Sequence, residues 1–390
     1  MTILTPPTTA ACLDDVERLG ATADARTREL HDARRIPDDL YRDAVDAGLF
    51  RQLVPTELGG LGHTPVDWFR AGVHLARHEP SLAWVVTQGA AELGWIAAGG
   101  DESWALEVLA DHRAVSASST AGVGLLSIAA GGTRLSGRWR FNTGCQGATW
   151  IGGLAMVDGE VTDAGMPAMR MAWVPADRAE IADDWRPSGL HGTGSHSTVI
   201  EEQDIDLRWT FDVFSPTAND RGAHRVLVGN GNWPIAASAA AVQVGNARRA
   251  LDEARDVIAT KAPMPDMRPL ATNAAVQRGL TEAEGLWHAA VVSVDVALAA
   301  MWDEATRHGE LSTATRVALH RANVTASRLS TRVVDAVVEL TGSEAVAHDH
   351  VLARCGRDAH ALHPHISVGG ASAEHNAKVD LGLEPLHILV

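Results

Sequence analysis

The feature that most restricts the possible folds of this chain is a series of long, alanine-rich segments in its C-terminal part. Apolar residues recur at helical spacing through residues 235–261, 270–307 and 312–340, and only short breaks separate these segments. Each segment is long enough to form one helix of a bundle, and short connections make consecutive helices antiparallel neighbours. With one further helix that ends near residue 362, the sequence predicts a C-terminal four-helix bundle.

The middle of the chain has a different pattern. Apolar and polar residues alternate in several short runs, with Gly and Asp between them, at residues 113–119, 133–141, 150–157, 169–174 and 197–205. Such alternation is typical of antiparallel strands in a sandwich or barrel. Before residue 112 the spacing is again helical. The sequence therefore predicts an α+β fold in three domains: an N-terminal α-helical domain (1–112), a middle antiparallel β-barrel or sandwich (113–225) and the C-terminal four-helix bundle (226–390).

Composition excludes several classes of function. The formal net charge is −16, and nucleic-acid binding requires a basic face. No run of eighteen apolar residues is present, which argues against a membrane span, and residues 1–11 do not have the pattern of a signal peptide. The cysteines are odd in number and far apart, at Cys12, Cys145 and Cys355, which is typical of reduced thiols in a cytoplasmic protein.

Several short motifs follow one another along the chain. They are Ile36-Pro37, Leu58-Gly59-Gly60, Gly137-Arg138-Trp139-Arg140-Phe141-Asn142-Thr143-Gly144, Gly192-Thr193-Gly194-Ser195 and Arg357-Asp358-Ala359. Each motif alone is weak. In this order, and over nearly the whole chain, they resemble the motifs of the acyl-CoA dehydrogenase superfamily. The resemblance implies the same three structural parts, with a flavin bound between the β-domain and the C-terminal bundle.

The resemblance also implies which residues contact the flavin. By position in the motifs these are Trp139, Phe141, Thr143, Gly192, Thr193, Ser195 and Arg357. Two alternatives stay open: the 192–195 segment can be a β-turn that uses glycine for positive φ, and Arg357 can form a structural ion pair with Asp358 instead of binding flavin oxygens. The residues do not distinguish FAD from FMN, and the resemblance favours FAD.

Two reactions are known for such a fold, and the residues distinguish between them. An acyl-CoA dehydrogenase needs a carboxylate base beside the flavin, but the positions where the superfamily carries it hold Ile366 or, in the first bundle helix, Ala236 and Ala237. We therefore expect no acidic side chain beside the flavin ring. The chain is more similar to the two-component flavin monooxygenases, in which a separate reductase supplies reduced flavin and dioxygen then forms a C4a-(hydro)peroxyflavin. An FAD-dependent acyl-CoA dehydrogenase-like oxidoreductase is the alternative.

In that branch a hydroxyl group on a strand and an imidazole assist the reaction of the activated oxygen. A pocket without water slows the loss of this oxygen as hydrogen peroxide. The hydroxyl here is Thr143, and the imidazole belongs to one of three histidines at a helix end, His360, His363 and His365. Sequence register favours His365 as the catalytic residue, with His363 second. Other interpretations are a solvated helix end, a metal site completed by His375 or Asp358, and a thiol–imidazole pair of Cys355 with His360. For Cys145, packing and contact with the flavin ring both stay open.

Substrate residues are expected on the helix at 81–98. Trp84, Gln88 and Trp95 share one helical face, which is apolar with a single amide. Such a face suits a small planar aromatic compound, with an indole-type compound as the most specific candidate, although an ordinary core stripe has the same pattern. The sequence thus predicts a reduced-flavin-dependent monooxygenase that hydroxylates a small aromatic substrate. It requires dioxygen and a separate reductase, and the superfamily resemblance implies a homotetramer or homodimer.

Overall fold

The computed structural model describes residues 10–162, 165–212, 219, 221–265 and 267–383, and it describes side chains from residue 13 onward. Cys12 therefore lies outside the described side chains. The N-terminal helices are α1 (Ala10–Ala25), α2 (Thr27–Ala33), α3 (Asp38–Asp46), α4 (Pro65–His78), α5 (Pro80–Gly99) and α6 (Glu102–Ala110). The helical segment expected from residue 13 to 33 is divided in two at Arg26.

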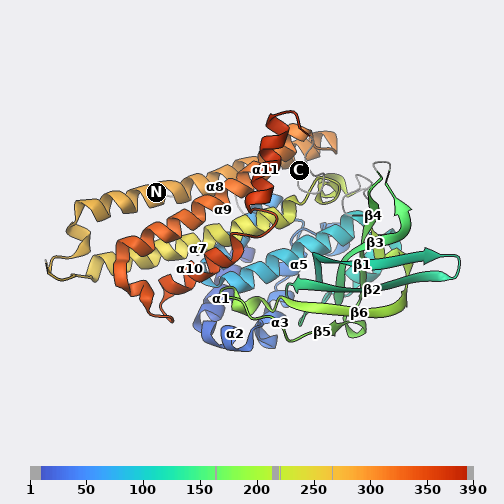
Figure 1. Ribbon diagram of the computed structural model, residues 1–390, viewed down its shortest axis with the longest axis horizontal. Coiled ribbons are helices and arrows are strands. Elements are labelled where there is room, and N and C mark those ends of the chain that lie inside the picture. The colour runs from blue at the N-terminus through green and yellow to red at the C-terminus, as the bar shows by residue number, and fades with distance from the viewer. Residues whose placement is uncertain (1–9, 163–164, 213–218, 220, 266, 384–390) are drawn as a thin grey trace.

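Helix α5 is the central element of the N-terminal part. Only Glu79 separates it from α4, because Pro80 has no N–H with which to continue the preceding helix. The Glu79 side chain caps it by accepting a hydrogen bond from the Ser81 N–H at 3.1 Å. Residues 80–98 are all buried, as expected for a helix surrounded by other elements. In Figure 1, α5 lies between the sheet and the long C-terminal helices.

Within the described residues the middle of the chain forms one seven-stranded sheet in the order β5-β6-β2-β1-β3-β4-β7. The strands are β1 (Ser116–Ala129), β2 (Gly132–Asn142), β3 (Trp150–Val161), β4 (Pro167–Pro175), β5 (Glu180–Ile181), β6 (His196–Ile205) and β7 (Thr210–Phe211). Neighbouring strands are antiparallel except β1 and β3, which are parallel with Ser116 opposite Trp150. Strand β2 runs back to the edge of the sheet where β1 starts, and β3 starts at that same edge. The sheet is therefore mixed, which corrects the expected all-antiparallel arrangement.

The C-terminal part is the expected helical bundle. Its helices are α7 (Trp233–Thr260), α8 (Ala274–His308), α9 (Thr313–Thr341) and α10 (Val351–Leu362), followed by α11 (Gly370–Asp380). Helices α7, α8 and α9 pack against one another, and α10 packs against α7 and α9 (Figure 1). Local signals set the ends: Ser312 Oγ accepts a hydrogen bond from the Thr315 N–H at 3.2 Å, and Gly309 ends α8 with a φ of 72°.

One of the described helices, α8, is long and apolar enough to cross a membrane, judged by length and composition alone. Its inner face packs against α9, whereas much of its opposite face is exposed. Val296 is 63% exposed and Val292 is 38% exposed on that side. An apolar helix face that is left uncovered in a single chain is a candidate contact surface.

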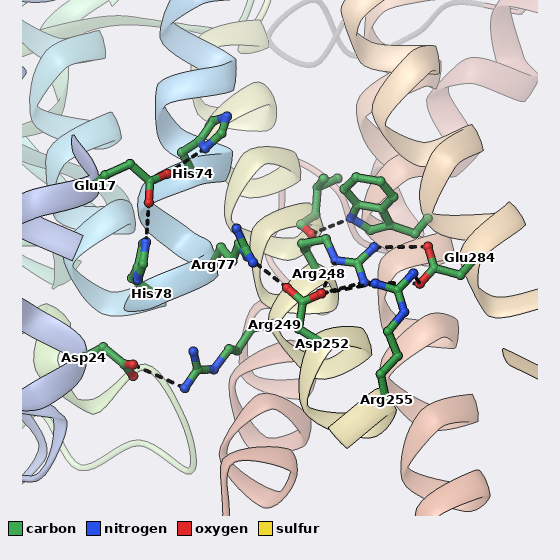
Figure 2. A network of polar contacts seen from close by, with 12 residues as sticks. Glu17, Asp24, His74, Arg77, His78, Arg248, Arg249, Asp252, Arg255 and Glu284 are labelled. Carbon is green, nitrogen blue, oxygen red and sulfur yellow. Dashed lines mark hydrogen bonds and ion pairs between the residues drawn. The ribbon is translucent and has the colours of Figure 1, made fainter. Parts of the chain in front are cut away.

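A polar network ties the N-terminal helices to the bundle (Figure 2). Asp252 of α7 accepts a hydrogen bond from Arg77 of α4 at 2.9 Å and forms an ion pair with Arg248 at 2.8 Å. Arg249 of α7 pairs with Asp24 of α1 at 3.2 Å. These contacts hold α1 and α4 against α7, and α4 and α7 both pack against α5.

Glu17 of α1 lies in the same region and binds two histidines of α4 (Figure 2). Its two carboxylate oxygens contact His74 Nδ1 at 2.9 Å and His78 Nε2 at 2.8 Å. Burial raises the pKa of Glu17, but the hydrogen bonds and charges of His78 and His74 outweigh it, so its pKa lies below the ordinary value of 4.5. A depressed carboxyl pKa adds stability above the unfolded pKa that is lost as pH falls through the folded pKa.

We expect Glu17→Gln to lower the midpoint of thermal unfolding at pH 7 and to have little effect below the folded pKa, in the acidic range under 4.5. Because Glu17 is half-exposed, the loss at pH 7 should stay below about 1 kcal/mol. Thermal unfolding measured along a pH series checks this, with Glu310→Gln on the surface as the control. A constant difference between Glu17→Gln and the parent protein at every pH would contradict it.

Candidate active site

A cavity of about 440 Å³ lies where the sheet meets α5, α7 and α10. This volume is in the range of small-molecule sites. One face of α5, residues 118–121 of β1, the end of β2, the loop before β6, the start of α7 and the end of α10 line it. Eight of the predicted site residues lie in its wall: Trp84, Gln88, Trp95, Phe141, Thr143, Thr193, Ser195 and His365. Segments far apart in the sequence therefore converge on one cavity.

The α5 face is a continuous stripe along the cavity. Trp84, Gln88 and Trp95 all line it, and Glu92 occupies the same stripe one turn beyond Gln88. Trp84 and Trp95 are only 5% and 6% exposed, so this wall consists largely of buried indole surface. The amide Nε2 of Gln88 is buried and has no hydrogen-bond partner among the described residues. A buried amide without a partner is costly, so a group bound in the cavity would stabilise it.

A chain of hydrogen bonds runs through the hydroxyl groups at the other wall. Trp84 Nε1 donates to Thr143 Oγ1 at 3.0 Å, Thr143 Oγ1 lies 2.9 Å from Ser195 Oγ, and Ser195 Oγ lies 2.8 Å from Thr193 Oγ1. Thr193 Oγ1 donates to the Leu190 carbonyl oxygen at 2.9 Å. Each hydroxyl has one proton, so Ser195 donates to Thr193 and Thr143 donates to Ser195. Thr143 thus keeps a free acceptor site, but no free donor.

Among the residues that the structure describes, His365 is the histidine that lines the cavity. Its ring meets Trp84 edge-on, with centroids 5.3 Å apart, and its Nδ1 accepts a hydrogen bond from the Ser367 N–H at 3.3 Å. That contact assigns the ring proton to Nε2 in the neutral form. Burial lowers the pKa of His365 to about 4. The ring is therefore neutral at pH 7 and offers one N–H donor.

Two residues of the cavity wall have unusual backbone conformations. Phe141 has a φ of 59° and Leu190 a φ of 55°, in the left-handed region that bulky residues rarely adopt. The Leu190 N–H donates to Asp358 Oδ1 at 2.6 Å, which helps to hold that conformation. Phe141 is half-exposed and meets Trp185 edge-on, with centroids 6.2 Å apart. Strained residues at one cavity lead to the hypothesis that this region has a function.

Glu92 is the residue in the cavity wall that sequence reasoning missed. It is 3% exposed, and its oxygens accept hydrogen bonds from Ser116 Oγ at 2.8 Å and the Ser118 N–H at 2.9 Å. Burial raises its pKa to about 7, against the effect of these hydrogen bonds. The cavity wall therefore contains a carboxylate, and the expectation that no acidic side chain lies beside the flavin ring stays a prediction. The spacing of four from Gln88 was the available signal, but the known base positions of the superfamily lie on other segments.

Two predicted residues lie away from the cavity. Trp139 is completely buried among the side chains of the sheet and donates from Nε1 to the Leu154 carbonyl oxygen at 2.8 Å. His363 turns toward α9, where its Nδ1 lies 3.4 Å from Thr331 Oγ1. The structure therefore corrects the expected positions: Trp139 is a core residue, and of the two candidate imidazoles only His365 reaches the cavity among the described residues.

Gly192 and Arg357 also lie outside the cavity wall. Gly192 is buried where an added Cβ would come within 3.1 Å of both Leu30 and Ser81. Arg357 donates from Nη2 to the His348 carbonyl oxygen at 2.9 Å, whereas Asp358 binds the Leu190 N–H instead. Burial raises the pKa of Asp358 to about 7. In place of the alternative ion pair with Arg357, Asp358 thus makes a contact that holds the loop at Leu190, and the flavin contacts of Gly192 and Arg357 stay predictions.

The other interpretations of the histidines receive little support. Among the described residues no group of three or more His, Cys, Asp or Glu is arranged to hold a metal ion. His360 is exposed and its Nε2 lies 2.9 Å from Asp335 Oδ1. Burial raises the pKa of both Cys145 and Cys355 to about 12, so both thiols stay protonated at neutral pH. Cys145 donates to the Gly194 carbonyl oxygen at 3.5 Å and packs in the sheet.

Comparison with protein families gives two matches that lie on either side of the sheet. Residues 9–112 match the model of the acyl-CoA dehydrogenase N-terminal domain, and residues 237–369 match the model of the acyl-CoA dehydrogenase C-terminal domain. Together these matches include α5 and α10, which line two sides of the cavity, and most of α7, whose cavity residue Ile235 lies just before the second match.

Individual relatives match over most of the chain. An indole-3-acetate monooxygenase of Pseudomonas putida is 26% identical, with 89% of this chain and 88% of that protein covered. The oxygenase component of an FADH2-dependent resorcinol hydroxylase of Rhizobium sp. strain MTP-10005 is 27% identical, with 95% and 94% covered. The crystal structure of a 3-HSA hydroxylase from Rhodococcus sp. RHA1 has the same fold, with a TM-score of 0.87, 23% identity and 98% and 99% coverage.

Proposed function

The chain belongs to the acyl-CoA dehydrogenase family, and we propose that it is the oxygenase component of a two-component, flavin-dependent monooxygenase. In this proposal a separate reductase supplies reduced FAD, and the chain hydroxylates a small aromatic substrate with dioxygen. The relatives that match over about nine tenths of the chain are named as monooxygenase and oxygenase component, which supports this assignment.

The observation that carries the proposal is the position of Trp84 between the two predicted catalytic side chains. Its Nε1 donates to Thr143 Oγ1, and its ring packs edge-on against His365. Thr143 and His365 come from the sheet and from the end of α10, so the fold brings a hydroxyl and an imidazole to one cavity. Proton transfer or hydrogen bonding by such groups is what oxygen activation at a flavin requires of a protein.

The cavity residues fit a reduced flavin. Aromatic side chains, including Phe141 and Trp185, offer flat surfaces for the ring system. The free acceptor site of Thr143 suits a ring N–H, which the reduced form of a flavin carries. The hydrogen bonds of Thr193 and Ser195 make the Thr143 hydroxyl donate to Ser195, so its remaining site can only accept. When bound, reduced flavin would supply the electrons that activate dioxygen.

His365 then acts as a neutral hydrogen-bond donor. Its Nε2–H can stabilise negative charge that develops on oxygen, and its low pKa prevents it from carrying a permanent positive charge. The buried indole rings of Trp84 and Trp95 limit the access of water to the same space. A dry site favours transfer of oxygen to the substrate over loss of hydrogen peroxide.

Rapid mixing of the protein and reduced FAD with oxygenated buffer tests this function. We expect an absorbance spectrum that differs from both reduced and oxidised flavin and that persists before reoxidation. Immediate reoxidation with no delay relative to free flavin would contradict the proposal. Titration with FAD and FMN decides between the flavins. Tightly bound flavin that is bleached anaerobically by acyl-CoA would instead support a dehydrogenase.

For the quaternary structure we propose a homodimer or homotetramer in the cytoplasm. Exposed small and apolar residues recur on the outer side of α8 at spacings of four and three, at Gly285, Ala289, Val292, Val296 and Ala299. This spacing is typical of a seam between packed helices. The described cysteines are unpaired thiols, as in a reducing compartment.

We expect Val296→Glu on this stripe to reduce the molar mass in solution, because a carboxylate would be buried without a partner in the seam. Light scattering after size-exclusion chromatography measures this. The control is Val161→Glu, since Val161 is a valine of similar exposure, 69%, at the end of β3. An unchanged mass for Val296→Glu, or a monomeric parent protein, would contradict a contact through α8.

A further inference from the structure

We propose that Glu92 selects the substrate by accepting a hydrogen bond from an N–H or O–H group of a neutral aromatic compound, and that it excludes aromatic carboxylates. This inference rests on the proposed function and adds the substrate class of the same cavity. It concerns the α5 wall, where Glu92 and Gln88 lie one helical turn apart.

The carboxylate of Glu92 is part of the cavity wall, and its hydrogen bonds to the protein leave some of its acceptor sites unused. Ser116 Oγ and the Ser118 N–H bind one oxygen each, and Trp173 Nε1 in turn donates to Ser116 Oγ at 3.0 Å. These contacts fix the side chain, because β1 supplies both donors. Above its pKa of about 7 the carboxyl group is ionised and has about four acceptor sites, so sites remain for a donor in the cavity.

Gln88 supplies the complementary group. Its Nε2 is buried and has no partner among the described residues, and the side chain is 8% exposed. The wall therefore presents an acceptor and a donor side by side, between the indole rings of Trp84 and Trp95. A phenolic hydroxyl can donate to Glu92 and accept from Gln88, and an indole N–H can satisfy Glu92. A flat ring that carries one such group matches the wall in both shape and polarity.

The charges around the cavity disfavour an anionic substrate. All 33 Lys and Arg residues of the sequence lie in the described part of the chain, and none of them lines the cavity. Its other titratable wall residue, His365, is neutral at pH 7. A substrate carboxylate would be buried without a cation and close to Glu92, which is unfavourable both by desolvation and by repulsion. The chain should therefore not bind the charged side chain of a compound such as indole-3-acetate.

Calorimetric binding of three probes tests the proposal: indole, 1-methylindole, which lacks the N–H, and indole-3-acetate. Each is titrated into the flavin-free protein and into the protein with reduced FAD under anaerobic conditions, at a pH well above the Glu92 pKa of about 7 so that this side chain is ionised. We expect indole to bind on the order of 10- to 100-fold more tightly than either other probe, the effect of one hydrogen bond to a charged group. Equal binding of indole and 1-methylindole, or of indole and indole-3-acetate, would overturn it.

The variant Glu92→Gln is expected to gain affinity for one of the probes. Because a misfolded protein would not bind a probe more tightly, this test does not depend on a loss that misfolding could also cause. The amide keeps the shape and removes the charge, so binding of indole-3-acetate should improve by about 10-fold while the preference for indole over 1-methylindole shrinks. Glu79→Gln is the matched control, because Glu79 is a fully buried carboxylate at the start of the same helix but outside the cavity wall. Unchanged preferences in Glu92→Gln would contradict the proposal.

The two proposals fail in distinguishable ways. Rapid mixing of reduced FAD with dioxygen needs no aromatic compound, so it reports on the proposed function alone. One possible result is a normal delay in reoxidation with probe affinities that depend neither on the N–H nor on the carboxylate. This result would reject only the role of Glu92. Absence of binding by all three probes would reject the substrate class.

Discussion

Replacement of His365 by asparagine is expected to lower the rate of substrate hydroxylation by about 100-fold or more, while the protein still consumes reduced flavin and dioxygen. The His365 ring is the neutral imidazole of the cavity wall, with Nδ1 occupied by the Ser367 N–H and the proton on Nε2. Loss of a positioned donor or proton-transfer group typically costs a factor of 10² to 10⁴. Reduced flavin would then react with dioxygen mainly to hydrogen peroxide.

The measurement is the ratio of hydroxylated product to reduced flavin consumed, together with the hydrogen peroxide formed. His363→Asn is the matched control, because His363 is only two residues away but contacts Thr331 outside the cavity. We expect this control to keep the parent ratio. Equal losses in the two variants would indicate a structural effect at the end of α10, and full coupling in His365→Asn would exclude His365 from the chemistry.

The helices and strands of this chain could be predicted from periodicity because their patterns are strong and local. The bundle helices α7, α8 and α9 start and end within four residues of the segments expected at 235–261, 270–307 and 312–340. Helix α5 could be located, but its burial on all sides could not, because that depends on the sheet and on α7. The parallel pairing of β1 with β3 was missed for the same reason: alternation reports which side of a strand is buried, but not which strand is its neighbour. The domain boundaries at 112 and 225 stay predictions.

Residues of the candidate site could be predicted where a family motif gives their positions. They were harder to predict where only tertiary contacts bring them to the cavity. Sequence register favoured His365 over His363, and the structure places only His365 at the cavity among the described residues. Glu92 was missed although it follows Gln88 by one turn, because a buried glutamate cannot be distinguished from a surface glutamate without knowledge of its surroundings. Its hydrogen-bond donors, Ser116 and Ser118, belong to a strand that no local pattern connects with α5.

The Gly-x-Trp-x-Phe motif contains residues with two different roles, one in the packing of the sheet and one in the cavity wall. Trp139 and Phe141 are two residues apart, but β2 places Trp139 in the core of the sheet and Phe141 in the wall of the cavity. Glycines make room for the indole ring: a Cβ at Gly153 would lie 2.3 Å from Trp139 Cε2, and a Cβ at Gly137 would lie 2.6 Å from its Cη2. The motif glycine is therefore explained by packing against Trp139, independently of any cofactor.

Replacement of Trp139 by alanine is accordingly expected to destabilise the protein by about 3–5 kcal/mol, the usual effect of removing a large buried aromatic ring. The Leu154 carbonyl oxygen would also lose its donor. Gly153→Ala should destabilise by about 1–3 kcal/mol, because the added methyl group must displace the ring. Chemical denaturation of the flavin-free protein measures both effects.

Phe141→Ala is the control that separates stability from binding. Phe141 is 50% exposed, so its removal should change the free energy of unfolding by less than about 1 kcal/mol. Its ring lines the cavity beside Trp185, and we therefore expect weaker binding of reduced FAD in that variant. Trp139→Ala should show the reverse pattern, with low stability but normal flavin affinity in the fraction that is folded. A stable Trp139→Ala protein that has lost flavin binding would show instead that Trp139 acts at the cofactor.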